Sequence, residues 1–149
     1  MDVRKMLVAD QAAVRVAAES IAARYYPEMI PDIAREAEIL TKARTDNRWY
    51  ARVIGPEGSP YAALIACTGD NLWATKRHST ILLWCSHMPR HGEALLKDYV
   101  LWVRAERMLL AGICDDVGAE FAPAAKVLER NGFVKRGGMY VFFPEGPKR

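Results

Sequence analysis

The chain has 149 residues, of which 51% are apolar, enough to fill one hydrophobic core, so we expect a single domain over 1–149. Its 21 basic and 18 acidic side chains leave a net charge of +3, far below that of a protein held to nucleic acid mainly by phosphate contacts. No apolar run approaches the ~18 residues that a membrane span needs, and the charged N-terminus is unlike an export signal. We therefore expect a soluble, cytoplasmic protein with no membrane partner, and the charge argues against nucleic acid.

The first half of the chain predicts one strand, two helices and a strand hairpin. Asp10 has a side chain that commonly caps a helix N-terminus, and Pro27 and Pro31 separate two helical patterns. The loop 55–60 is dense in turn-forming residues, which is typical of a hairpin. The predicted elements are, in order, a strand over 3–8, a helix after Asp10, a helix over 32–43, and strands over 48–54 and 61–68.

In the second half, strands and helices are predicted to alternate. The segment 80–86 is continuously apolar, as in a strand buried on both faces, and 71–74 is a candidate for a further strand before it. The elements that follow are a helix over 93–105, a strand over 108–114, a helix with apolar Phe121, Ala124, Ala125 and Leu128, and an aromatic strand over 139–143. The last helix stops at Gly132, which suits a left-handed C-cap, and a glycine turn at 137–138 precedes the last strand.

Three cysteines, Cys67, Cys85 and Cys114, each lie inside an apolar run. Such positions favour reduced core thiols over a disulfide framework, which again predicts an intracellular protein.

The order strand, two helices, three strands, helix, strand, helix, strand, closing on Asn131-Gly132-Phe133, resembles the GNAT superfamily of N-acetyltransferases. The resemblance implies an α/β (α+β) fold with a mixed, mostly antiparallel central sheet flanked by helices on both faces. It implies acetyl-CoA as cofactor, with its pantetheine arm between splayed fourth and fifth strands and its pyrophosphate at the following helix N-terminus. It also places residues 24–26 near the acceptor site, although an exposed turn is the simpler explanation of them.

The resemblance assigns cofactor binding to the end of the fourth strand and the segment after it. The family pattern of Gln or Arg, two residues, Gly, one residue, then Gly or Ala is incomplete in either register that uses Gly92. An ordinary helix-entry loop is the alternative. The candidate cofactor-binding residues are Trp84, Cys85, Ser86, Arg90, His91, Gly92, Glu93 and Ala94.

The usual proton donor of the family is absent from this sequence. Many members carry a tyrosine five residues before the closing Phe, where this chain has Leu128, and an aliphatic side chain cannot donate a proton. The candidate catalytic residues are instead His87, Tyr140 and Cys114, with Asp115 a further substitute, and each has a structural interpretation beside the catalytic one. We predict no metal site, because Pro89 lies between His87 and His91.

Segments 69–73 and 81–86, with the closing 131–133, also resemble small GNAT-like proteins of tailed phages, some of them virion or assembly proteins. Three functions follow from the resemblance. The first is an acetyl-CoA-dependent N-acyltransferase acting on a small-molecule or protein amine. The second is a catalytically silent protein that binds phage structural proteins in the host cytoplasm or virion. The third is an enzyme that modifies a DNA base, and a homodimer is left open in each case.

Overall fold

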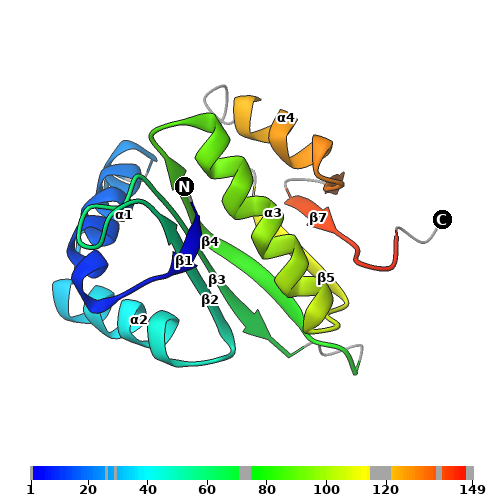
Figure 1. The fold of residues 1–149 in the computed structure, drawn as a ribbon, viewed down its shortest axis with the longest axis horizontal. Helices are drawn as coiled ribbons and strands as arrows, with labels where there is room; N and C mark the ends of the chain where they lie inside the picture. The colour runs from blue at the N-terminus through cyan, green and yellow to red at the C-terminus, as the bar shows by residue number, and fades with distance from the viewer. Residues whose placement is uncertain are drawn as a thin grey trace.

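The computed structural model describes residues 2–25, 27–28, 30–70, 75–114, 122–136 and 139–146. Within these residues seven strands form one sheet in the order β1-β2-β3-β4-β5-β7-β6 (Figure 1). The strands are β1 (Val3–Lys5), β2 (Trp49–Ile54), β3 (Ala62–Gly69), β4 (His78–Ser86), β5 (Leu110–Cys114), β6 (Val134–Arg136) and β7 (Met139–Phe142). All neighbours are antiparallel except β4 and β5, which are parallel. The predicted mixed, mostly antiparallel sheet is confirmed.

Helices cover both faces of this sheet, as expected (Figure 1). They are the short 3-10 helix η1 (Val8–Asp10), α1 (Gln11–Tyr25), α2 (Ile33–Thr45), α3 (Pro89–Ala105) and α4 (Ala122–Arg130). On the α3 and α4 side the buried core includes Leu64, Leu95, Tyr99, Leu128 and Phe142. On the α1 and α2 side it includes Met6, Val14, Leu40, Val53 and Ile65.

None of the helices in the described part of the chain has the length and apolarity that crossing a membrane requires.

Two predicted boundaries are wrong by more than two residues, and one strand is missed. The helix expected over 93–105 begins four residues earlier, at Pro89, which is well placed at a first helical position because its missing N–H has no partner there. The first strand ends at Lys5, because the chain turns into η1 instead of continuing to Val8. The three-residue strand β6 pairs with β7 and was not predicted. The candidate strand 71–74 and the turn at 137–138 lie outside the described residues.

Asp10 directly precedes α1, but its carboxylate joins separate segments of the chain. It accepts two hydrogen bonds from the Arg4 guanidinium (2.7 and 2.9 Å), and one each from the amides of Leu7 (2.8 Å) and Gly58 (2.9 Å). The Asp10 side chain is fully buried, which opposes ionisation, but these hydrogen bonds outweigh burial and hold its pKa below the usual value. This contact fixes the start of α1 beside the β2–β3 loop.

The predicted C-cap at Gly132 is confirmed. Gly132 has φ +89°, its amide donates to the Glu129 carbonyl (3.1 Å), and the Phe133 amide donates to the Leu128 carbonyl (3.0 Å). These two bonds form a Schellman motif, which turns the chain from α4 into β6.

Candidate functional site

Strands β4 and β5 part after a short stretch of pairing. Within the described residues they pair only from His78 with Leu110 to Thr80 with Gly112, although β4 continues to Ser86. Immediately beyond this point β4 has a bulge, because Ile81 and Leu83, but not Leu82, pair with β3. The predicted splay of the fourth and fifth strands is therefore present in the backbone.

The bulge also corrects the expectation that this strand is buried on both faces. Leu82 is 55% exposed, and only Ser79 and Ile81 are fully buried in β4. A β-bulge bends its strand and interrupts the ladder, so the end of β4 separates from β5 and leaves one edge open.

The backbone amides of Trp84 and Ser86 point toward that open edge. The His87 amide donates to the Tyr61 carbonyl on the β3 side (3.0 Å). Because successive amides of a strand point to opposite edges, those of Trp84 and Ser86 point away from β3, to the side where β5 has diverged. The arrangement offers two hydrogen-bond donors to an extended ligand between the strands.

The first turn of α3 follows directly. Ser86 Oγ hydrogen-bonds to the backbone of Met88, accepting from its amide (3.1 Å) and donating to its carbonyl, so it closes the tight turn between β4 and α3. Arg90 is exposed in the first turn of α3, where its positive charge and the N-terminal end of a 17-residue helix both favour an anion.

Gly92 has a role in packing. A Cβ added there would lie 3.3 Å from the Ser86 Cβ and 3.4 Å from the Trp84 Nε1, and Trp84 Nε1 donates to the Gly92 carbonyl (3.0 Å). Gly92 therefore allows α3 to approach the end of β4 closely, and it has no open space in front of it. This packing role is an additional role for Gly92, whose part in cofactor binding stays a prediction.

The remaining cofactor candidates on α3 are also engaged within the protein. Glu93 bonds to Arg130 and Asn131, and these hydrogen bonds lower the Glu93 pKa to about 2. His91 is 7% exposed and stacks on the Tyr61 ring, with ring centroids 6.1 Å apart. Ala94 packs against the α3-side core. Each of these three side chains has contacts within the protein, and their part in cofactor binding stays a prediction.

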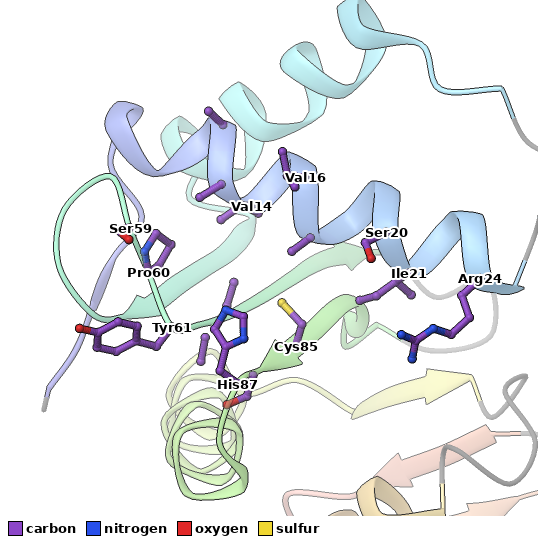
Figure 2. Close-up of a pocket in the computed structure, with 16 residues that line it drawn as sticks. Val14, Val16, Ser20, Ile21, Arg24, Ser59, Pro60, Tyr61, Cys85 and His87 are labelled. Atoms are coloured by element: carbon purple, nitrogen blue, oxygen red, sulfur yellow. The ribbon is translucent and has the colours of Figure 1, made fainter.

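A cavity of about 750 Å³ lies on the opposite face of the sheet, between α1 and the ends of β3 and β4 (Figure 2). It exists because α1 makes its closest backbone contacts with α2 and η1, and because α1 carries alanines on the side that faces the strands. The residues that line it are Ala12, Ala13, Val14, Val16, Ala17, Ser20, Ile21, Arg24, Ser59, Pro60, Tyr61, Ala62, Ala63, Cys85, Ser86 and His87.

The two features meet at the last residues of β4. Trp84 packs on the α3 side, whereas Cys85 faces the α1 side and lines the cavity with His87. The open edge of β4 and the cavity therefore converge on 84–87. The α1 wall of this site was not predicted from the sequence. The sequence signal for it is the run of alanines in α1, at positions where a tightly packed helix would carry larger residues.

Two of the three catalytic candidates, His87 and Tyr140, lie apart. His87 is exposed and lines the cavity, whereas Tyr140 is only 4% exposed in the core on the α3 side, with Lys135 against its ring (5.7 Å). Cys114 ends β5, but its side chain and Asp115 lie outside the described residues. Leu128, at the position where the resemblance expects tyrosine, is fully buried. Of the candidates whose side chains the structure describes, His87 is the one that lines the cavity.

Cys85 lines the cavity as a thiol. Burial raises the pKa of Cys85 and of Cys67, and both are free cysteines. A raised pKa keeps the thiol protonated at neutral pH, so Cys85 is a poor nucleophile.

Comparisons with known proteins support the fold. No protein-family model matches the sequence, and a comparison with curated proteins finds no match. Among solved structures, a ribosomal-protein-alanine N-acetyltransferase from Brucella melitensis aligns over 96% of this chain and 99% of its own, with a TM-score of 0.74 and 14% identity. A GNAT-family acetyltransferase from Staphylococcus aureus Mu50 aligns over 96% of this chain and 98% of its own, with a TM-score of 0.72 and 12% identity. One chain of the NatC complex bound to Gag peptide and CoA aligns over 96% of this chain and 99% of its own, with a TM-score of 0.69 and 10% identity.

These likenesses establish the fold: the chain has the architecture of GNAT acetyltransferases over nearly its whole length. They give no support to the narrower likeness to phage proteins. At such low identity the substrate of a neighbour does not transfer to this chain.

Proposed function

We propose that the protein is an N-acyltransferase that uses acetyl-CoA as donor and an amine as acceptor. The observation that carries the proposal is the convergence at 84–87, where the open edge of β4 and the cavity on the α1 face reach the same residues. Transfer between two bound molecules requires their reacting atoms to be held together, and this strand end provides one place for both. The fold shared with known acetyltransferases supports the same conclusion.

The backbone around β4 fits an extended pantetheine arm. The amides of Trp84 and Ser86 would hold it, and the N-terminal turn of α3 with Arg90 would hold the pyrophosphate. Gly92 would contribute by allowing α3 to approach the end of β4 closely. The cofactor supplies an activated acetyl group as a thioester.

In the proposed reaction the amine occupies the cavity and its nitrogen forms a bond to the acetyl carbon, while the carbon–sulfur bond breaks. The products are an amide and a free thiol. His87, exposed at the cavity, accepts the proton that the nitrogen loses. The departing sulfur takes its proton from water in this proposal: among the candidates whose side chains the structure describes, Leu128 cannot donate one and Tyr140 is buried in the core on the other face of the sheet.

Calorimetric titration with acetyl-CoA tests the donor site. We expect saturable binding that weakens at least tenfold in Arg90→Glu, because the substitution reverses a charge beside the pyrophosphate position. Arg35→Glu makes the same charge change at an exposed position of α2. This variant is the control and should bind acetyl-CoA as the wild type does.

The catalytically silent alternative has one observation in its favour, the fully buried Leu128 in place of the usual tyrosine. An assay of thiol release with a panel of amines separates the two. Saturable acetyl-CoA binding with no thiol release for any amine would favour the silent protein, whereas amine-dependent release would support the enzyme.

A further inference from the structure

A second pocket lies at the edge of the sheet where β1 and β2 pair. It is bounded by the end of β1, the first residues of β2, the end of α2 and Trp102 of α3. Its volume is about 160 Å³, and it shares no lining residue with the cavity beside α1. Drug-sized ligands occupy pockets of about 300–1,000 Å³. This pocket therefore suits a small ion or a single chemical group of a larger molecule.

The pocket is positively charged. Lys5, Arg44 and Arg52 all line it, and the ion pairs in the described part of the chain include none of these three residues. The carboxylate in the lining is that of Asp46, which accepts a hydrogen bond from the Arg48 amide (2.8 Å). Three cations thus share the pocket with one carboxylate.

Two of these cations repel each other across the strands. Lys5 and Arg52 are directly opposite in the β1–β2 ladder, so their side chains leave the same face of the sheet, with Cβ atoms about 4.5–5.5 Å apart. Like charges placed in this way destabilise a strand pair. The Arg52 guanidinium lies over the Tyr50 ring (5.9 Å), and the Tyr50 hydroxyl donates to Asp98 (2.7 Å), but Asp98 forms no ion pair with either cation within the described residues. An anion between the two would turn this repulsion into attraction.

The Arg44 side chain has unused hydrogen-bond donors. Its Nε is buried and has no acceptor among the described residues. Arg44 lies in the last turn of α2, where the helix dipole favours a cation, which explains its charge but not its unpaired donors. Buried donors in folded proteins nearly always have a partner. The guanidinium groups of Arg44 and Arg52 with the Lys5 ammonium offer the donors that phosphate oxygens accept best.

We propose that this pocket binds a phosphate-type oxyanion, as free phosphate or as the phosphate group of a monoester, between Lys5, Arg44 and Arg52. The charge of the lining selects an anion, and the volume excludes a whole nucleotide or acyl-CoA. The inference goes beyond the proposed acetyl transfer and does not depend on it. The pocket lies two strands away from β4 and contains none of the residues assigned to the donor or acceptor.

Indole N–H signals in NMR spectra of the labelled protein test the site. Trp49 and Trp102 line the pocket, whereas Trp84 lies at the proposed donor site, where its indole donates to the Gly92 carbonyl. Sodium phosphate should shift the Trp49 and Trp102 signals saturably, and sodium chloride at the same ionic strength should not. Equal shifts in the two salts, or shifts confined to Trp84, would overturn the proposal.

Neutral variants identify the cations that hold the anion. Lys5→Gln and Arg52→Gln should each weaken phosphate binding about tenfold, because each removes a charge-assisted hydrogen bond. Arg35→Gln removes the same charge from an exposed position of α2 and should bind phosphate as the wild type does. Phosphate affinity unchanged in both pocket variants would contradict the assignment.

Thermal melts provide a second measurement. In chloride, Lys5→Gln should melt no lower than the wild type, because the substitution removes the repulsion from Arg52. Phosphate should raise the melting temperature of the wild type and raise that of Lys5→Gln much less. A lower melting temperature of Lys5→Gln in chloride, or an equal rise in phosphate for both proteins, would overturn the proposal.

Titration with O-phosphoserine beside inorganic phosphate distinguishes the two sources of the anion. Tighter binding of inorganic phosphate would identify the free ion, and tighter binding of O-phosphoserine would identify an esterified group. Either order supports the site, whereas failure of both probes to bind would overturn it. None of these measurements uses acetyl-CoA, so their outcome is independent of the test of the acyltransferase function.

Discussion

Glu93 in the second turn of α3 and Arg130 in the last turn of α4 form a two-point salt bridge, with Nε–Oε1 and Nη2–Oε2 distances of 3.0 and 2.7 Å. The Asn131 amide nitrogen donates to the same carboxylate (3.1 Å). Asn131 belongs to the closing motif by which the family resemblance was first identified. One function of that motif here is to hold the end of α4 against the start of α3, beside the proposed donor site.

The Glu93 contacts should make stability depend on pH in the acid range. Hydrogen bonds from Arg130 and Asn131 lower the Glu93 pKa from 4.5 to about 2. A carboxylate whose pKa is lowered by folding stabilises the protein fully above its unfolded pKa, and this contribution is lost as the pH falls toward the folded value. Melting temperatures of wild type and Glu93→Gln should therefore differ above pH 4.5 and converge toward pH 2. A difference that does not vary with pH would contradict the assignment.

Asp10 should be the costliest single carboxylate to replace. It is fully buried and accepts hydrogen bonds from Arg4, Leu7 and Gly58. Removing its charge leaves buried donors unpaired, so we expect Asp10→Asn to lower the free energy of unfolding by about 3–5 kcal/mol in urea titration. Exposed Asp46, which accepts one hydrogen bond from the Arg48 amide (2.8 Å), provides the control, and Asp46→Asn should cost far less. Similar losses for the two variants would show that the Asp10 contacts add little.

Arg107 offers a stabilising substitution. It follows α3 with φ +53°, a left-handed conformation that glycine adopts without strain, and its amide donates to the Arg104 carbonyl (3.0 Å). We expect Arg107→Gly to raise the free energy of unfolding by about 0.5–1 kcal/mol. Glu106 has φ −78°, so Glu106→Gly should lower the free energy of unfolding. Thermal melts of both variants check these two expectations. A loss of stability in Arg107→Gly would argue against the left-handed conformation.

The order of the elements could be predicted from the sequence, and most departures have a local cause. The apolar periodicity of α3 becomes regular only after its first turn, so periodicity alone places the start of this helix at Glu93. Pro89, which suits a first helical position, is the sequence signal for the earlier start. Strand β6 has three residues, of which two, Lys135 and Arg136, are polar and exposed, so no alternation predicts it.

The location of the candidate site could be predicted from the sequence, but the contacts of its residues could not. The end of β4 was expected to bind the cofactor, but hydrophobic pattern alone does not show which way a strand amide points or that a bulge occurs at Leu82. The roles of Glu93 and Gly92 depend on Arg130 and Trp84, which are distant or on another element, and sequence spacing cannot show these contacts.

Substitutions of His87 and of Tyr140 should differ in their effect on turnover. His87 lines the cavity, whereas Tyr140 is buried on the other side of the sheet. We expect His87→Gln to lower kcat at least tenfold while acetyl-CoA affinity changes less than twofold, because general-base catalysis contributes ~100-fold or more. Tyr140→Phe, which removes only the hydroxyl, should retain turnover. Steady-state assays of thiol release check both, and the reverse pattern would move the proton transfer to Tyr140.

The most direct test of the account is backbone NMR of the isotope-labelled protein during titration with acetyl-CoA. The amides of Trp84 and Ser86 should shift together and saturably, because they point to the open edge of β4. The His87 amide, already bonded to Tyr61, should move much less and provides the internal reference. Saturable shifts confined to other parts of the chain, or no shifts at millimolar acetyl-CoA, would contradict the proposed donor site and with it the acyltransferase function.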